Sequence, residues 1–313
     1  MLTRRSVAFF NTVRQGLALN ALDRLLEAVL FLAGLAFGSF LNVCISRIPR
    51  DLSIVTPPSH CEDCDAPIRW YDNVPLVSWL ALRGRCRHCA VRIPVRHLAV
   101  ELFTALLFTS CYLSFGWTLL TLKFCVFGFL LIGLIFMDAE TGLLPREFTY
   151  SGIVLGLVFS AIVPTDYSAT ALLLRLFDKH VQSVHGLSLL DSVLGGLVGA
   201  GFFYLAWAFY YLVRKKDGLG FGDITLMGMS GAFLGLKLIL LVIVCSPLLA
   251  VVYVCILLVR EMFVSRTKPE TGLEEEVEPF FSRQIPFGVF LGVCSLGAIF
   301  LGEAVWSWYL RRI

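Results

Sequence analysis

Long apolar stretches alternate with short polar ones along almost the whole chain. Each stretch is close to 20 residues with almost no charge, enough for a helix to cross about 30 Å of hydrocarbon. Helices are expected because lipid offers no hydrogen-bond partners to an open backbone. The pattern predicts about eight spans, at residues 25–45, 98–115, 117–137, 148–164, 190–213, 223–235, 237–259 and 287–309. The sixth is short and rich in Gly and Met, so it can also be a half-span or an interfacial segment.

The composition agrees with a chain that resides in a bilayer. Of the 313 residues, 58% are hydrophobic and 16% are charged, whereas soluble domains carry about 25% charged residues. The expected fold is therefore an all-α polytopic membrane protein surrounded by membrane lipid. The net charge of only +3 gives no indication of nucleic-acid binding.

One long polar insert interrupts the apolar pattern. It divides the chain into an N-terminal lead at 1–24, a first transmembrane helix at 25–45, the insert at 46–97 and a transmembrane core at 98–313. The first apolar stretch continues into a motif discussed below. The N-terminal region is therefore not expected to be a cleaved signal peptide.

The insert is rich in arginine, which marks the cytoplasmic side of a membrane when it lies near the ends of spans. These arginines are Arg47, Arg50, Arg69, Arg83, Arg85, Arg87, Arg92 and Arg96. The insert is therefore expected to face the cytoplasm, which with eight spans places both chain termini outside. The basic N-terminal region and Arg311–Arg312 argue against that placement of the termini.

Four of the ten cysteines cluster in this insert. Cys61-x-x-Cys64 is followed by Cys86-x-x-Cys89, and two such pairs can complete a tetrahedral thiolate site for zinc. The loop has too little apolar mass to fold unaided, and a structural zinc ion would supply the missing stabilisation. Two disulfides are the alternative, although thiols stay reduced in the cytoplasm. A catalytic zinc fits less well, because four thiolates leave no open coordination position.

Two aspartates stand where apolar spans begin or end. Asp138 ends the third span, within Phe136–Pro145, and Asp223 opens the sixth, directly after Gly220 and Gly222. Charged residues in such places are costly, and each one needs a reason. Taken singly, Asp138 can be a solvated charge at a helix end, and Asp223 can be a helix N-cap.

Taken together, the two aspartates indicate a catalytic pair, because the expected topology places both at the same membrane face. Two carboxylates held close together cannot both ionise cheaply, so one keeps a proton. The ionised one can activate water while the protonated one polarises a scissile carbonyl. Asp138 and Asp223 are therefore predicted to be the catalytic residues of an aspartyl protease. Gly220 and Gly222 would let a peptide backbone approach, and Pro145 is included in this expected substrate approach.

Other protease chemistries fit the sequence less well. The chain has no His-Glu-x-x-His metalloprotease motif. The segment Gly228–Gly231 is similar to the serine motif of rhomboid proteases, but that chemistry needs a histidine base on a later helix. No histidine follows His185. Ser230 is therefore expected to serve close helix packing instead.

Several motifs, in their order along the chain, resemble the bacterial prepilin peptidases, also called type IV leader peptidases. They are Phe37–Val43, Arg47–Pro49, Trp70–Trp79, Gly84–Cys89, Glu101, the two aspartate motifs and Ile285–Gly288, together covering about residues 30–300. Two departures bear on substrate preference. Arg146 stands where the family usually has an acidic residue, and Thr225 stands where it often has Lys.

The resemblance implies two activities. One removes the short basic leader of type IV prepilin or pseudopilin precursors at the cytoplasmic face of the bacterial inner membrane, for type IV pili or type II secretion. The other N-methylates the newly exposed residue, usually Phe, with S-adenosylmethionine. The chain has no Rossmann-type glycine motif after a strand, so the methyl-donor site is expected between the loop and the spans. Its candidates are Asn42, Arg47 and Glu101, although Glu101 can also be a helix-start charge favoured by the dipole.

Two other functions compete with this interpretation. A presenilin-like intramembrane protease shares the Gly-x-Gly-Asp element at Gly220–Asp223. However, the chain has no Pro-Ala-Leu near its C-terminus, and the cysteine loop is foreign to that group. A proton-coupled transporter could use the two aspartates as relay groups, but that function leaves the cysteine loop unexplained.

Overall fold

The computed structural model describes residues 21–176, 183–215, 220–267 and 286–312. Its elements are α2 (Ala21–Arg47), η1 (Ile48–Arg50), η2 (Trp70–Asn73), α3 (Val77–Ala81), α4 (Val95–Phe115), α5 (Leu119–Thr141), α6 (Arg146–Ile162), α7 (Ser168–Leu176), α8 (Val184–Arg214), α9 (Phe221–Thr267) and α10 (Phe287–Leu310). The described chain has no strand beyond two isolated β-bridges, so the predicted all-α architecture is confirmed. Residues 1–20 of the predicted lead and Ile285 lie outside the described residues.

Six helices are long and apolar enough to cross a membrane, namely α2, α4, α5, α8, α9 and α10. The protein is therefore a multi-spanning membrane protein. The count differs from the predicted eight in two places. Helix α6, with 17 residues, is not among the six, and the sixth and seventh predicted spans form one element, α9, of 47 residues. The number of crossings, like the division into four segments, stays a prediction.

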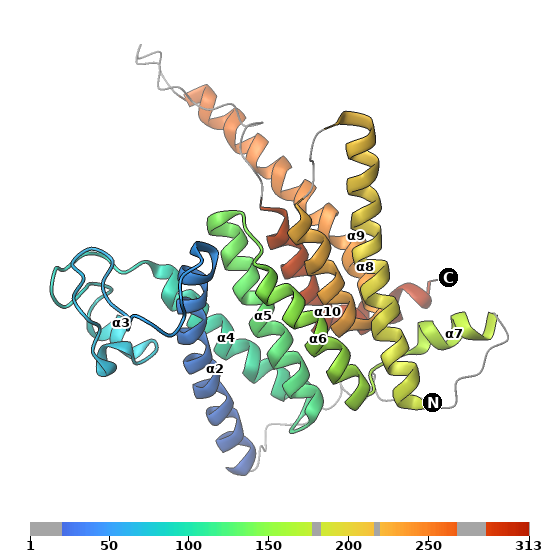
Figure 1. Cartoon of the computed structure of the whole chain (residues 1–313), viewed down its shortest axis with the longest axis horizontal. Helices are drawn as coiled ribbons and strands as arrows, with labels where there is room; N and C mark the ends of the chain where they lie inside the picture. The colour runs from blue at the N-terminus through green and yellow to red at the C-terminus, as the bar shows by residue number, and fades with distance from the viewer. Residues whose placement is uncertain (1–20, 177–182, 216–219, 268–285, 313) are drawn as a thin grey trace.

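Helix α9 is folded back on itself at Gly235. This residue has φ 78° and ψ 177°, a conformation open to glycine and strained for other residues. A Cβ added at Gly199 of α8 would meet both Met227 and Ile239. The chain therefore passes the same level of α8 before and after the turn, in opposite directions (Figure 1).

We call residues 221–234 the first leg of α9 and residues 236–267 the second leg. The first leg is enclosed by protein, since every residue from Asp223 to its end is buried. In this leg Phe233 stacks on Phe127 of α5 with ring centroids 4.6 Å apart. The buried hydroxyl of Ser230 accepts a hydrogen bond from Ser295 of α10 at 3.1 Å, in agreement with a packing role.

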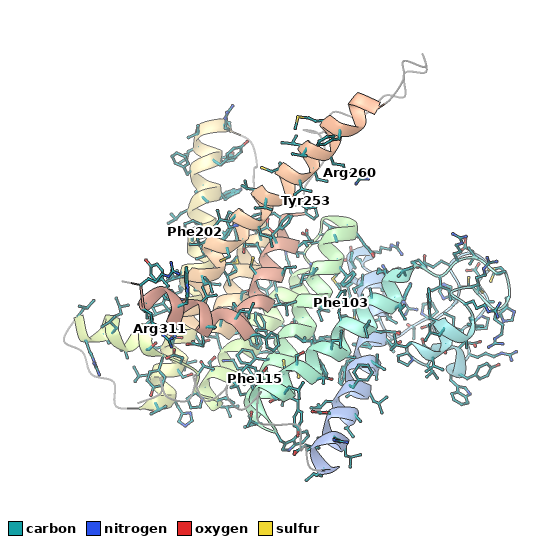
Figure 2. All side chains as sticks on the ribbon, turned by 180° about the vertical axis from the view of Figure 1, so that it is seen from behind. Phe103, Phe115, Phe202, Tyr253, Arg260 and Arg311 are labelled. Carbon is teal, nitrogen blue, oxygen red and sulfur yellow. The ribbon has the colours of Figure 1, made fainter. Side chains whose placement is uncertain are left out.

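The second leg runs along α10 and then leaves the bundle. Tyr253 still packs on Phe290 of α10, with ring centroids 5.3 Å apart. Arg260 lies on the part that extends past the neighbouring helices (Figure 2). The second leg therefore returns to the end of the bundle from which the first leg starts.

The cysteine loop lies beside the bundle, next to α2 and α4 (Figure 1). Hydrogen bonds attach it to both helices: Arg47 of α2 donates to the carbonyls of Ser53 and Pro57 at 3.0 and 2.8 Å, and the Leu76 amide donates to Glu101 Oε2 of α4 at 2.8 Å. Asn42 Nδ2 of α2 donates to the His97 carbonyl of α4 at 3.0 Å, which joins the two helices to each other. The loop is thus tied to the roots of both helices.

Candidate active site and metal centre

Asp138 lies in the last turn of α5 and is only 5% exposed. A carboxylate at a helix C-terminus meets the unfavourable end of the helix dipole, so it needs compensation. Helix α10 supplies it, because the Val289 amide donates to Asp138 Oδ2 at 3.0 Å. Val289 belongs to the first turn of α10, where free amides favour a negative charge. Asp138 therefore joins the end of one helix to the start of another.

Asp223 lies in the first turn of α9 and is 7% exposed. Helix α9 already begins at Phe221, and the Asp223 amide donates to the Gly220 carbonyl at 3.1 Å. Asp223 is therefore inside the helix and is not its N-cap. Its neighbour Gly222 lies against Leu144, and Leu144 and Asp138 both lie against Gly288. The two predicted catalytic aspartates thus come together at one end of the bundle.

Leu144, in the connection between α5 and α6, fills the space around this pair. A Cβ at Gly222 would lie 2.7 Å from Leu144 Cβ. A Cβ at Gly288 would lie 2.8 Å from Asp138 Oδ2 and 3.0 Å from Leu144 Cδ1. Gly222 is therefore needed for close packing, and Gly288 for the approach of α10 to the carboxylate.

The remaining residues predicted for substrate approach, and the two departures from the family pattern, lie around the pair. Gly220 is exposed, and Pro145 is the N-cap residue of α6. Arg146 is exposed, and the Thr225 hydroxyl donates to the Gly222 carbonyl at 2.9 Å. Arg146 and Thr225 therefore leave both carboxylates of the pair in place.

The close approach of α10 gives a first prediction. Replacing Gly288 with alanine should lower proteolytic activity about 10- to 100-fold, because the added methyl group would displace Asp138 from the Val289 amide. Gly297→Ala on the same helix is the matched control, since a Cβ there meets nothing within 4 Å. The measurement is the rate of substrate cleavage by each purified variant. Equal rates for Gly288→Ala and Gly297→Ala would contradict the prediction.

The four cysteines of the loop come together as predicted. Their Sγ atoms all lie within 4.8 Å of one another, and those of Cys61 and Cys89 are 3.8 Å apart. A zinc ion with four bonds of about 2.3 Å separates its sulfur ligands by about 3.8 Å. All four cysteines are free. The donor set and spacing therefore suit a tetrahedral zinc ion and not two disulfides.

The two cysteine pairs are built on the same backbone pattern. The amide of Cys61 donates to the Ala66 carbonyl at 3.0 Å, and the amide of Cys86 donates to the Val91 carbonyl at 2.8 Å. In the second turn, the amides of Cys89 and His88 face the Cys86 sulfur and lower the pKa of this thiol to about 7. A thiolate, the form that binds metal, is thus favoured there by the backbone.

An ion pair fastens the second cysteine pair to the rest of the loop. The Arg87 guanidinium donates to both carboxylate oxygens of Asp72, with Nε–Oδ2 2.9 Å and Nη2–Oδ1 2.6 Å. Hydrogen bonding to Arg87 lowers the pKa of Asp72. Such bidentate pairs are geometrically specific, so this one fixes how Trp70–Asn73 sits on the metal site.

Asn42, Arg47 and Glu101 line one cavity of about 830 Å³ between the loop and α2 and α4. Glu101 is 8% exposed and lies in the second turn of α4, so it is not a charge at the helix start. Arg47 donates to the carbonyls of Ser53 and Pro57, at 3.0 and 2.8 Å. The structure thus brings the three predicted residues together at the roots of the loop.

Three residues that line this cavity carry buried polar atoms that find no hydrogen-bond partner in the described part of the chain. They are Asn42 Oδ1, Trp79 Nε1 and Arg96 Nε. Buried polar atoms are nearly always paired in native proteins. One acceptor and two donors without a protein partner beside a cavity of this size fit a site that a polar ligand or ordered water completes.

The cavity reaches the end of α5 that carries Asp138. Arg96 of α4 forms an ion pair with Glu140 of α5, and both residues line the cavity. Glu140 follows Asp138 by less than one helical turn. The two candidate sites are therefore neighbours at the same end of the bundle.

Comparison with known proteins agrees with these sites. Residues 32–115 match the model of the bacterial peptidase A24 N-terminal domain, and residues 125–255 match that of the type IV leader peptidase family. A prepilin leader peptidase/N-methyltransferase of Aeromonas hydrophila is 31% identical over 94% of this chain and 97% of its own length. The chain belongs to the type IV leader peptidase family.

Two further relatives of the same description differ in coverage. The one from Myxococcus xanthus is 39% identical over 67% of this chain but only 56% of its own length. The one from Neisseria gonorrhoeae is 33% identical over 70% of this chain and 78% of its own length. No solved structure matches the chain.

The sequence did not reveal that a backbone amide at the start of α10 contributes to the aspartate pair. The motif ending in Gly288 was recognised without a role, and the structure places it against Asp138. One signal was available, since a carboxylate at the end of a helix needs donors from elsewhere. The ion pair of Arg96 and Glu140 was missed as well, because both residues look like ordinary charges at the ends of spans.

Proposed function

We propose that this protein removes leader peptides from type IV prepilin-like precursors and N-methylates the new N-terminal residue. The observation that carries the proposal is the meeting of Asp138 and Asp223 at one end of the bundle, with Asp138 held by the start of α10. The relatives described as prepilin leader peptidase/N-methyltransferase support both activities and the class of substrate.

Asp138 and Asp223 divide the proteolytic work. The amide of Val289 stabilises an ionised Asp138, which accepts a proton from water as the water oxygen attacks the scissile carbonyl carbon. Asp223 carries the shared proton and donates it to the carbonyl oxygen. When the tetrahedral intermediate collapses, the C–N bond breaks and a proton passes to the leaving amine. The products are the free leader and a new amino terminus.

The cavity under the loop is the proposed methyl-donor site. S-adenosylmethionine, when bound, supplies a methyl group on a sulfonium centre to the new amine. Glu101 offers a carboxylate to the cationic part of such a ligand, while Arg96 and Trp79 line the same cavity with donors that have no protein partner, Nε and Nε1. Asn42 Oδ1 is an open acceptor for an ammonium group. This donor and acceptor set carries opposite charges in one cavity, as an amino-acid-like cofactor requires.

We propose that a zinc ion stabilises the part of the loop that forms the outer wall of that cavity. Its ligands would be Cys61, Cys64, Cys86 and Cys89. Cys61 and Cys86 line the cavity themselves. We further propose that the loop and both sites face the cytoplasm, on the evidence of the arginine-rich loop. Cleavage and methylation would then act on the same side of the membrane.

A direct assay tests the proteolytic part. The purified protein in detergent should convert a type IV prepilin precursor to a product shortened by its leader, and mass spectrometry would identify the cleavage site. A precursor that stays intact with folded, zinc-loaded protein would refute the proposal.

The separation of the two sites predicts separate losses. Glu101→Gln should lower methylation of a pre-cleaved pilin by about tenfold or more, because it removes the carboxylate from the cavity and keeps the shape of the side chain. Asp138→Asn should leave that methylation unchanged while stopping cleavage. The two variants serve as controls for each other, and transfer of label from S-adenosylmethionine is the measurement. Loss of methylation in Asp138→Asn, with normal methylation in Glu101→Gln, would show the assignment to be wrong.

A further inference from the structure

A second group of buried charged and polar residues lies at the far end of the bundle from the aspartate pair. Lys123 of α5 is fully buried, and its Nζ donates to Ser160 Oγ of α6 at 3.0 Å. Ser160 Oγ in turn donates to the Ala232 carbonyl, near the end of the first leg, at 3.4 Å. Ser192 of α8 donates to the same carbonyl at 2.5 Å. A cation and hydroxyl donors thus gather where a helix C-terminus exposes carbonyls.

Asp191 of α8 completes this group on the other side of the turn. It is 1% exposed, and its Oδ2 accepts the amide of Leu236, the first residue of the second leg, at 3.2 Å. Its Oδ1 accepts from the Thr170 hydroxyl at 2.5 Å. A Cβ at Gly235 would collide with Asp191 Oδ2. The carboxylate therefore caps the second leg at the turn.

These contacts join the same two helices that carry the aspartate pair. Lys123 and Asp138 lie near opposite ends of α5, and the turn at Gly235 and Asp223 lie at opposite ends of the first leg. A helix advances about 1.5 Å per residue, so each distance is roughly 20 Å. Because a helix is stiff over this length, fixing its far end also fixes the height and rotation of its near end.

We propose that Asp191, with Lys123, is a positioning residue that sets Asp223 opposite Asp138 from across the membrane. The inference rests on the proposed function of that pair. A buried carboxylate within an apolar span is costly and needs a reason. This one accepts the Leu236 amide and lies against Gly235, so both contacts act on the turn of the leg that carries Asp223.

Kinetics of purified variants test the proposal. Asp191→Ala should lower kcat for leader cleavage about 10- to 100-fold with little change in KM, because a misplaced dyad slows chemistry more than binding. Asp191→Asn keeps an acceptor for the Leu236 amide and should lose less. Methylation of pre-cleaved pilin should remain at the level of the unmodified protein in both. Asp23→Ala is the matched control, since Asp23 of α2 also accepts from a hydroxyl, that of Tyr112, at 3.3 Å.

A cross-link gives a readout that does not depend on activity. Cysteines introduced at Leu144 and Gly222 would have Cβ atoms 2.7 Å apart before relaxation, so the two segments must separate by about 1 Å to reach the roughly 3.8 Å of a disulfide. Oxidation should form this bridge readily in the otherwise unchanged chain and about tenfold more slowly after Asp191→Ala, with the bridged peptide measured by mass spectrometry.

The outcomes separate the two proposals. Unchanged cross-linking in the Asp191→Ala protein would overturn the positioning role, as would equal loss of cleavage and methylation, which indicates general misfolding. Failure of the unmodified protein to cleave any precursor would count against the proposed function, while the cross-link would still decide the role of Asp191.

Discussion

Replacing either Asp138 or Asp223 with asparagine is expected to reduce leader cleavage by roughly a thousandfold or more. Asparagine keeps the size of the side chain but can neither take a proton from water nor give one to the carbonyl oxygen. The two residues share one proton-transfer cycle, so the double variant should be no worse than either single one. Initial rates of cleavage in detergent provide the measurement.

Asp166→Asn is the control for both variants. Asp166 lies in the connection between α6 and α7, and its carboxylate pairs with Lys237 at 2.7 Å, which lowers the pKa of Asp166. Lys237 also pairs with Glu303 at 2.7 Å, so it keeps a partner when Asp166 is changed. This variant should cleave like the unmodified protein. Near-normal cleavage by Asp138→Asn or Asp223→Asn would remove the pair from the mechanism.

Loss of one cysteine ligand is expected to remove most of the metal from the protein. The purified chain should contain about one zinc ion, and Cys86→Ser should contain little, because three remaining ligands cannot hold a structural site of this kind. The proposed methyl-donor cavity would then lose the wall that the loop forms, and methylation should fall more than cleavage.

Elemental analysis of the purified protein and labelled-methyl transfer measure these two effects. Cys255→Ser is the matched control, because Cys255 is an exposed cysteine on the second leg of α9, away from the loop. Full zinc content in Cys86→Ser would exclude this ligand. Oxidised loop thiols in cells would favour the disulfide alternative.

Much of the architecture could be predicted because it depends on local sequence. Hydropathy places the long helices but not all of their ends, since α8 begins at Val184 where residue 190 was predicted, and it does not predict the short helix α7. The predicted break between residues 235 and 237 coincides with the turn at Gly235. The spacing of the cysteines in two short turns is sufficient to predict their cluster. Asp138 and Asp223 stand out because the expected topology places two carboxylates at the same membrane face, where one keeps a proton.

The contacts between helices could not be predicted in the same way. The donor to Asp138 is a backbone amide of Val289, and a backbone group leaves no trace in residue identity. Lys123 and Asp191 look like isolated charges in apolar spans until the neighbours of α5 and α8 are known. Hydropathy reports which segments enter lipid but carries no information on which of them touch.

The contact between α10 and Asp138 has a consequence for the biosynthesis of the protein. The ribosome makes α10 after every other element that builds the aspartate pair, and the start of α10 supplies the amide that holds Asp138. A nascent chain that has inserted everything up to α9 therefore has both carboxylates but lacks the donor that holds one of them in place. Under the proposed mechanism, the chain becomes able to cleave its substrate only when α10 docks against Asp138.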